Sequence, residues 1–306
     1  MSMRNLKFEL TDEQVQKRLE TFERLRTLPE IIDFMKRFEC PDAIIEANAF
    51  QFKNWVLNKR KAESYTPQEL ENDPSLGQYV DLIYDQSTGI LSEQIYELPI
   101  VREIAEENAY LNQYVIFDLP LSLHNALFSK ISIEHENPNY LNVLEDMINF
   151  VENDKLGYYL YGNLGIGKSY LSACVSNDFA KSGRNVAFIH VPKLMSHLKQ
   201  LFTHPSEMEY TLRKLRKVPL LVLDDLGAEP ITSWSRDEIL LSILNERLEN
   251  KKKTIITSNY SPDMLVDLYK LDNKGTSDEI RAKRLVDRIH ALTIPYEMVG
   301  QNRRNK

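Results

Sequence analysis

The chain has 306 residues, of which 42% are hydrophobic and 27% charged, and its formal net charge is −7 at pH 7. This composition is typical of a soluble globular protein that is long enough for two domains with sizeable cores. No stretch approaches the roughly 20 apolar residues that span a bilayer, and the polar start lacks a signal-peptide core. We therefore expect a cytoplasmic protein without a membrane partner.

The net charge hides a difference between the front and the back of the chain. Residues 1–136 contain 14 Lys and Arg against 24 Asp and Glu, whereas residues 137–306 contain 24 against 21. The front therefore carries a net charge of −10 and the back one of +3. An acidic front would repel nucleic acid and favours a protein partner, while the back tolerates phosphates. The alternative is two solvated surfaces without any preference.

The front of the chain predicts a compact helical domain with a short β element. The expected helices start after a capping box at Thr11–Gln14, at Pro29, and at Pro41, the last reaching towards Leu57. Two apolar runs, Val80–Tyr84 and Ile90–Tyr96, flank a polar turn and predict a hairpin. We expect this domain over residues 1–113 and a linker over residues 114–136.

Strands and helices alternate in the back of the chain. A helix from Pro138 to Asn153 is expected first, and strands are expected at Leu156–Tyr161, Asn185–Val191, Leu220–Leu223, Thr254–Thr257 and Ala291–Pro295. Such alternation favours an α/β domain, here residues 137–306, with a parallel sheet and helices on both faces.

A phosphate loop lies between the first of these strands and a predicted helix, Ser169–Lys181. Residues 162–169 fit the G-x-x-x-x-G-K-[ST] pattern, in which the curled backbone points N–H groups at a nucleotide triphosphate. Lys168 would bridge the β- and γ-phosphates of ATP, and Ser169 would hold Mg²⁺. The expected nucleotide-binding residues are Gly162, Asn163, Leu164, Gly165, Ile166, Gly167, Lys168, Ser169 and Tyr170. An ordinary glycine-rich turn with a surface lysine is the alternative.

Two later strands end in polar side chains that suit the same site. Asp224 and Asp225 end an apolar run, as in a Walker B element, so that Asp224 would hold the Mg²⁺ and Asp225 would polarise the attacking water. Asn259 follows the next expected strand and could position the water or contact the γ-phosphate. A plain turn at Asn259 is the alternative.

Three arginines, Arg281, Arg284 and Arg288, recur at spacings that bring them to one side of a helix. Near a nucleotide fold such arginines suggest a sensor in the same chain and a finger at a subunit boundary, since a guanidinium can neutralise charge on the γ-phosphate. A solvated basic helix face is the alternative.

In this order, the motifs resemble those of AAA+ ATPases of the helicase-loader and transposition-helper branch. With the acidic helical front, the chain is most similar to bacterial primosomal replicative helicase loaders of the DnaI type. The resemblance implies that Asn259 is sensor 1, Arg284 the arginine finger and Arg288 sensor 2. It also implies that the front grips the replicative hexameric helicase, that the ATPase domain binds ATP, single-stranded DNA and other copies of itself, and that other primosome proteins take part.

Three departures from the family pattern qualify this resemblance. Many AAA+ proteins have Glu where this chain has Asp225, so we expect slow, switch-like hydrolysis. The chain ends 18 residues after Arg288, which predicts no C-terminal helical lid. Some relatives hold zinc in the front domain, but here that region has only Cys40, with His124 and His135 further on, and we expect no zinc. Cys40 and Cys174 are expected to be small buried hydrophobes.

A contact with single-stranded DNA is less specified by the sequence. Cations alternate with aromatic residues at Lys193, His197, Lys199, Phe202, Tyr210, Arg213, Lys214, Arg216 and Lys217. This composition suits phosphates and stacked bases, although a solvated face would look the same. The function expected is ATP-dependent loading of the replicative helicase onto single-stranded DNA. A transposition-helper ATPase acting with a transposase, and a binding module whose nucleotide site is merely structural, are the alternatives.

Overall fold

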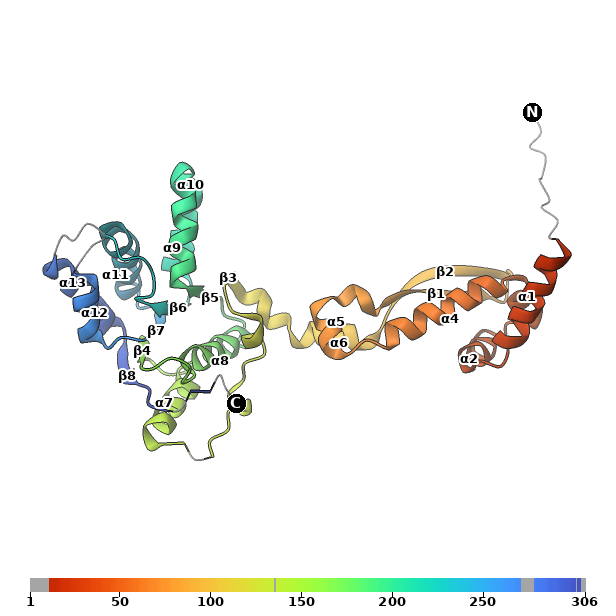
Figure 1. Ribbon diagram of the computed structural model, residues 1–306, viewed down its shortest axis with the longest axis horizontal. Helices are drawn as coiled ribbons and strands as arrows, with labels where there is room; N and C mark the ends of the chain where they lie inside the picture. The colour runs from red at the N-terminus through yellow and green to blue at the C-terminus, as the bar shows by residue number, and fades with distance from the viewer. Residues whose placement is uncertain (1–10, 135, 271–277, 301, 304–306) are drawn as a thin grey trace. The chain divides into compact units, whose positions relative to one another are not determined.

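The computed structural model describes residues 11–134, 136–270, 278–300 and 302–303 (Figure 1). The chain divides into two compact units, Met1–Ala109 and Tyr110–Lys306. Each unit has its own hydrophobic core. Within the described ranges, no helix has both the length and the apolar character needed to cross a membrane.

The first unit is a set of helices followed by an antiparallel hairpin. Its helices are α1 (Asp12–Leu25), α2 (Pro29–Phe38), α3 (Asp42–Ala47), α4 (Ala49–Glu63), α5 (Pro67–Asn72) and α6 (Pro99–Glu107), and its strands are β1 (Gln78–Asp85) and β2 (Ile90–Glu97). The predicted capping box at the start of α1 is present, since Thr11 and Gln14 bond each other's backbone N–H groups. The helix predicted from Pro41 is interrupted, because the Asn48 side chain bonds the Ile44 carbonyl and the chain restarts as α4.

Aromatic side chains form the core of the first unit. The Phe34 ring meets the rings of Phe52 and Trp55 edge-on, at centroid distances of 5.0 and 5.5 Å. The Trp55 indole N–H donates to the buried Asp81 carboxylate of β1 at 2.7 Å. Strand β1 therefore packs against α4, whereas most of β2 remains exposed.

The second unit contains a six-stranded parallel sheet in the order β3-β5-β6-β7-β4-β8. The strands are β3 (Tyr114–Phe117), β4 (Gly157–Tyr161), β5 (Val186–His190), β6 (Leu220–Leu226), β7 (Lys253–Ser258) and β8 (Ile294–Glu297). The helices are α7 (Pro138–Asn149), α8 (Lys168–Lys181), α9 (Val191–Gln200), α10 (Pro205–Lys217), α11 (Leu241–Glu249), α12 (Pro262–Tyr269) and α13 (Glu279–Leu292), with a π-helical segment at Trp234–Leu240. The parallel sheet with helices on both faces confirms the predicted fold class.

Successive residues of the central strands point to opposite, buried faces of the sheet. In β6, Leu220 and Val222 join the core that contains α7 and α8, whereas Leu221 and Leu223 join the core that contains α9 to α13. Both faces are therefore covered, which explains why these strands read as continuous apolar runs. The order of strands brings the ends of β4, β5, β6 and β7 to one edge.

Two sequence expectations differ from the structure here. The segment 114–136, expected as a linker, supplies the edge strand β3, and its backbone carbonyls at His124 and Ala126 accept bonds from the buried Asn177 amide. The strand expected at Ala291–Pro295 begins later, because α13 continues to Leu292 before β8 starts at Ile294. Both apolar stretches were visible in the sequence, but their tertiary partners were not.

Candidate functional site

The loop of residues 162–167 joins β4 to α8 in a conformation that requires glycine. Gly162, Gly165 and Gly167 all have positive φ angles, of 136°, 80° and 101°. A Cβ on Gly162 would lie 2.3 Å from the Met298 carbonyl oxygen, and one on Gly165 would lie 2.2 Å from the Asn302 side chain. The backbone of Met298 therefore approaches the loop closely at Gly162, while a side chain does so at Gly165. The end of the loop coincides with the positive end of α8.

Lys168 opens α8 and is buried, with 8% of its surface exposed. Its ammonium donates to the carbonyl oxygens of Gly162 and Asn163, both at 2.8 Å, and to Asn259 Oδ1 at 2.9 Å. The structure therefore joins Lys168 and Asn259, which are 91 residues apart, at the edge where β4 and β7 end. A buried ammonium at a helix N-terminus suits a phosphate.

Asp224 lies at the centre of a set of oxygen donors. Its Oδ1 accepts bonds from Ser169 Oγ at 2.8 Å and from Thr257 Oγ1 at 2.7 Å. Burial raises the pKa of the Asp224 carboxyl, and the charge of Asp225 adds to the rise, although the two hydroxyl bonds oppose it. A buried carboxylate beside hydroxyl oxygens is a donor set that fits Mg²⁺, whose charge would favour the ionised form.

Asp225 takes a left-handed conformation with φ of 62°, which is uncommon for a residue other than glycine. The strand pairing between β6 and β7 is irregular between Leu223 and Leu226, so the bulge lies at the two aspartates. The Asp225 side chain accepts a bond from Asn259 Nδ2 at 3.3 Å, and its second oxygen lies 3.7 Å from His190 Nε2. Such backbone strain at a cavity wall is typical of functional residues.

These groups line one cavity of about 870 Å³. Its polar end contains Lys168, Ser169, Asp224, Asp225 and Asn259, and its other walls include the apolar side chains of Pro120, Leu123 and Ile131. The volume and the mixed lining suit a nucleotide. Gly165, Gly167, Leu164 and Tyr170 also line the cavity, whereas Ile166 is buried in the core.

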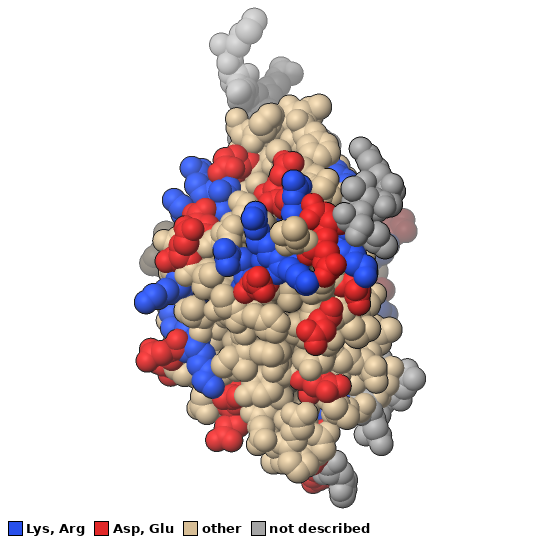
Figure 2. Space-filling view, turned by 90° about the vertical axis from the view of Figure 1, so that its left-hand side faces the viewer, with Lys and Arg blue, Asp and Glu red and all other residues tan. Residues whose placement is uncertain are grey.

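The arginines of α13 do not line this cavity. Arg284 is exposed and makes no hydrogen bond or ion pair with the part of the chain that the structure describes. Arg288 Nε donates to Asn245 Oδ1 of α11 at 2.6 Å. The surface on the side of α12 and α13 mixes positive and negative side chains, and a group of Lys and Arg side chains near its centre lies among carboxylates (Figure 2).

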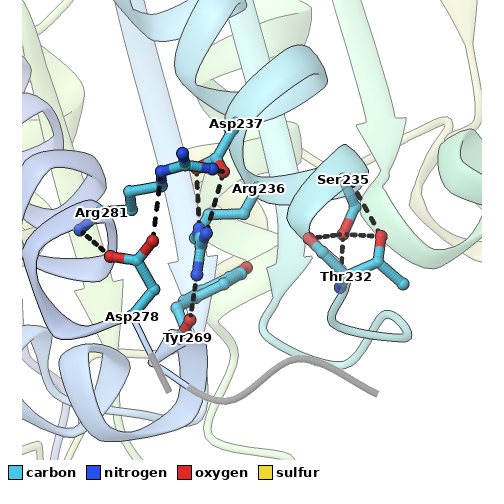
Figure 3. A network of polar contacts seen from close by, with 7 residues as sticks. All are labelled: Thr232, Ser235, Arg236, Asp237, Tyr269, Asp278 and Arg281. Carbon is cyan, nitrogen blue, oxygen red and sulfur yellow. Dashed lines mark hydrogen bonds and ion pairs between the residues drawn. The ribbon is translucent and has the colours of Figure 1, made fainter. Parts of the chain in front are cut away.

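Arg281 belongs to a network of ion pairs at the start of α13 (Figure 3). It pairs with Asp237 and Asp278, both at 3.1 Å. Asp237 also binds the buried Arg236, which donates to the Tyr269 carbonyl oxygen at 2.9 Å. The network ties α13 to the π-helical segment and to α12, so Arg281 holds this helix in place.

Sequence reasoning missed three residues of the cavity wall. Thr257 lies on β7, two residues before Asn259. Its hydroxyl donates to Asp224 Oδ1 and accepts a bond from the Asp225 backbone N–H. His190 ends β5 and pairs in register with Asp224, and its buried Nδ1 has no hydrogen-bond partner in the described structure. Arg303 reaches the cavity from the end of the chain. The polar ends of β5 and β7 were a usable signal for the first two, whereas nothing in the sequence indicated the third.

The basic and aromatic residues between β5 and β6 occupy α9, α10 and the turn between them. Lys193, His197 and Lys214 line a second cavity of about 340 Å³, which also contains Asp118. Lys214 and Arg213 lie 4.5 and 5.6 Å from the centroid of the Tyr210 ring. Arg216 is different, because it is paired with Glu209 at 2.7 Å and with Glu246 at 3.4 Å.

The parallel sheet, the glycine loop and the lysine, serine and aspartates at the strand ends define a P-loop ATP-binding protein of the AAA+ type. Residues 135–304 match the family model described as IstB-like ATP binding protein. This match covers more than half of the chain, and the chain belongs to that family.

Individual relatives are similar over different lengths. The replicative helicase loader DnaI of Bacillus subtilis (strain 168) is 26% identical over 298 residues, which is 95% of this chain and 94% of that protein. A putative insertion sequence ATP-binding protein, y4pL of Sinorhizobium fredii (strain NBRC 101917 / NGR234), is 32% identical over 145 residues, 47% of this chain and 57% of that protein. The resemblance to DnaI-type loaders predicted from the sequence is confirmed.

Two solved structures are each similar to about two thirds of this chain. A crystal structure of DnaI has a TM-score of 0.53 at 29% identity and covers 64% of this chain and 99% of its own. A putative primosome component from Streptococcus pyogenes serotype M3 has a TM-score of 0.53 at 28% identity and covers 65% of this chain and 100% of its own.

Proposed function

We propose that this protein is an ATP-dependent loader of the replicative hexameric helicase onto single-stranded DNA during initiation or restart of bacterial replication. The observation that carries the proposal is the extent of the similarity to DnaI, which includes the first unit as well as the ATP site. The first unit has its own core and would supply a separate binding surface.

A transposition-helper ATPase is the second candidate. The insertion-sequence relative has the higher identity, at 32%, and is also named as an ATP-binding protein. That similarity covers only 47% of this chain, however, whereas the similarity to DnaI covers 95% of it.

In the proposed ATP site, residues Gly162 to Tyr170 hold the phosphates and Lys168 neutralises their charge. Ser169 and Asp224 would hold Mg²⁺, which would supply positive charge to the phosphate oxygens. Asp225 orients the attacking water. Asn259 fixes the Asp225 carboxylate relative to the Lys168 ammonium, since its side chain bonds both. His190 Nε2 lies 3.7 Å from the Asp225 carboxylate. The short aspartate side chain supports slow hydrolysis.

Arg284 and Arg288 are proposed to act where two copies of the chain meet. Arg284 is free to reach the phosphates of a neighbouring copy, as an arginine finger would. Arg288 is held by Asn245 and would have to exchange that bond to act as a sensor. Both proposals require self-association through the ATPase unit.

The partners are proposed to bind different units. Residues 1–136 would contact the helicase, since this part is acidic and has exposed apolar side chains. Single-stranded DNA would contact α9 and α10, where Lys193 and Lys214 converge. Reversing the charge of these two lysines should weaken DNA binding and flatten its salt dependence. Arg216 is unsuitable for this test because it is committed to two glutamates.

The decisive experiment mixes the purified full-length protein with the host's replicative helicase, ATP and a circular single-stranded DNA, and measures helicase bound to DNA and unwinding. Loading above the level of helicase alone would support the proposal. Lys168→Ala should lower ATP affinity by about 100-fold, because it removes a buried charge from the phosphate site, and should abolish loading. Full loading by Lys168→Ala, or no contact with the helicase, would overturn it in favour of the transposase partner or of a structural nucleotide site.

A further inference from the structure

The first unit contains a cavity of about 230 Å³ between α2, α4 and the β1–β2 hairpin. Five of the side chains that line it are buried: Phe34, Trp55, Tyr79, Asp81 and Leu82. Ligand pockets usually start at about 300 Å³, so this cavity is sized for a single side chain rather than for a whole small molecule.

Asp81 is the one charged residue among these five, with 7% of its surface exposed. One of its carboxylate oxygens accepts the Trp55 indole N–H at 2.7 Å. The other accepts no hydrogen bond, and Asp81 forms no ion pair, with any residue that the structure describes. Buried carboxylates are otherwise paired with a cation, because an ionised group loses its hydration inside a protein. Asp81 therefore has an acceptor oxygen left over at the wall of the cavity.

The cavity also carries an excess of negative charge. Its lining contains four carboxylates and two cations: Glu30, Asp33, Glu63 and Asp81 against Arg37 and Lys59. Arg60, outside the lining, neutralises Glu30 through two hydrogen bonds of 2.6 and 2.9 Å. Three carboxylates then remain against two cations, so one further cation would balance the charge of the cavity.

Aromatic rings form much of the remaining lining: Phe34, Phe38, Trp55, Tyr79 and Tyr96. The face of such a ring attracts a cation electrostatically. Two rings already have one, since Arg37 lies 5.0 Å from the Phe38 centroid and Lys59 lies 5.5 Å from the Trp55 centroid. The Tyr79 and Tyr96 rings, whose centroids are 5.3 Å apart, have no cation over them within the described ranges. They remain available for a cation from outside the chain.

We propose that this cavity binds one cationic side chain, an arginine or a lysine, of the protein that the first unit holds. The cation would take the Asp81 oxygen that Trp55 leaves free, while its apolar stem lies against the Tyr79 and Tyr96 rings. The acidic character of residues 1–136 favours a partner with a basic surface around that side chain. This inference rests on the proposed function, in which the partner is the replicative helicase, and it names the chemistry of the contact.

The first test titrates the full-length protein with the host's replicative helicase. Asp81→Asn keeps an acceptor oxygen for the Trp55 indole and the shape of the cavity, but removes the charge. It should weaken helicase binding about ten-fold, as expected for one charge-assisted contact, and leave ATP affinity unchanged. Glu20→Gln is the matched control, because it makes the same change in net charge at an exposed position of α1 outside the cavity. It should bind the helicase like the unchanged protein.

The second test uses Trp55 itself as the reporter. The chain has two tryptophans, so in a Trp234→Phe variant the tryptophan fluorescence comes from Trp55 alone. N-acetyl-arginine amide should change this fluorescence in a saturable way, whereas N-acetyl-citrulline amide, which has nearly the same shape without the charge, should not. Adding Asp81→Asn should abolish the response.

The inference is wrong if Asp81→Asn, with an unchanged melting temperature, binds the helicase like the unchanged protein, or if the arginine and citrulline derivatives act alike on Trp55. Should Asp81→Asn fail to fold, the comparison of the two derivatives decides alone. If the unchanged protein does not bind the helicase while Trp55 responds to the arginine derivative only, the proposed function fails and the cation site stands.

Discussion

The two units of this protein use β-structure in opposite ways. In the second unit, Tyr158, Tyr159 and Leu160 of β4 are all fully buried, because helices cover both faces of the sheet. In the first unit, β1 packs on α4, but its partner β2 is mostly exposed, with Ile95 at 78% exposure. Ile95 lies directly opposite Val80, which is 42% exposed.

This difference indicates which surface of each unit is available for binding. The covered sheet leaves only its strand ends open, and there the polar side chains of the ATP site gather. The hairpin instead offers a flat apolar pair on an acidic domain, which suits a protein partner. We therefore expect that a substitution can unfold or inactivate one unit without affecting the other, and the following substitutions test this expectation.

The largest effect should come from Phe52→Ala in the first unit. Phe52 is fully buried and its ring lies 5.0 Å from Phe34 and 6.0 Å from Trp55. The cavity should cost about 4 kcal/mol of unfolding free energy, enough to unfold this unit. Thermal denaturation should lose one transition, and helicase binding should disappear while ATP affinity is retained. Loss of ATP affinity would show that the units depend on each other.

A converse experiment removes the buried arginine of the second unit. Arg247 is fully buried, and its guanidinium bonds Thr254 Oγ1 and the carbonyl oxygens of Leu215 and Val218, at 2.8 to 2.9 Å. Arg247→Met would leave these carbonyl oxygens unpaired and should cost about 3 kcal/mol, measured by urea unfolding. Arg213→Met, at an exposed arginine on α10, should cost almost nothing, and equal costs would contradict the assignment.

Comparison with the sequence shows which parts of the molecule local patterns can predict. The motifs predicted the end of β4 correctly and that of β7 within one residue, because an apolar run followed by glycine or polar residues is a local signal. Strand β6 instead continues to Leu226, past the expected end at Leu223, with its pairing to β7 interrupted at the aspartates. The prediction that Lys168, Ser169, Asp224 and Asn259 share a site follows from strand order in a parallel sheet. Their joint position agrees with that expectation, although their roles in catalysis stay predictions.

Other features depend on contacts between segments far apart in the chain. Strand β3 was interpreted as part of a linker, since only its pairing with β5 makes it a strand. Arg303 has no motif, and its place at the cavity depends on bonds to Gly165 and Glu136. The left-handed Asp225 could not be foreseen either, because its conformation arises from the irregular pairing of β6 with β7.

A smaller effect is expected from the buried carboxyl of Glu229, which links the Walker B strand to α12. It accepts bonds from the Gly227 N–H, at 2.8 Å, and from the Tyr269 hydroxyl. Burial raises the pKa of Glu229, so the folded state binds its proton more tightly than the unfolded state does. Its contribution to stability is therefore lost as the pH rises from about 4.5 through the higher folded pKa.

Glu229→Gln removes this titration and keeps one acceptor and one donor for the two neighbours. Unfolding free energies measured between pH 4.5 and 8 should show a gain over the unchanged protein at the upper end and none at the lower end. A difference that does not vary with pH would mean that Glu229 acts only through packing.

The smallest effect on stability should come from Ile95→Ser on the exposed hairpin. Ile95 buries little of its surface, so the unfolding free energy should change by less than about 0.5 kcal/mol. If the Val80–Ile95 pair contacts the helicase, the affinity of the Ile95→Ser variant for the helicase should nevertheless fall several-fold in a binding titration. Met264→Ser, at a 54% exposed residue of α12, is the matched control and should leave helicase binding unchanged. Equal helicase binding by both variants would mean that another surface of the first unit makes the contact. Loss of helicase binding in Ile95→Ser alone, without loss of stability, would show that the hairpin binds the helicase but contributes little to folding.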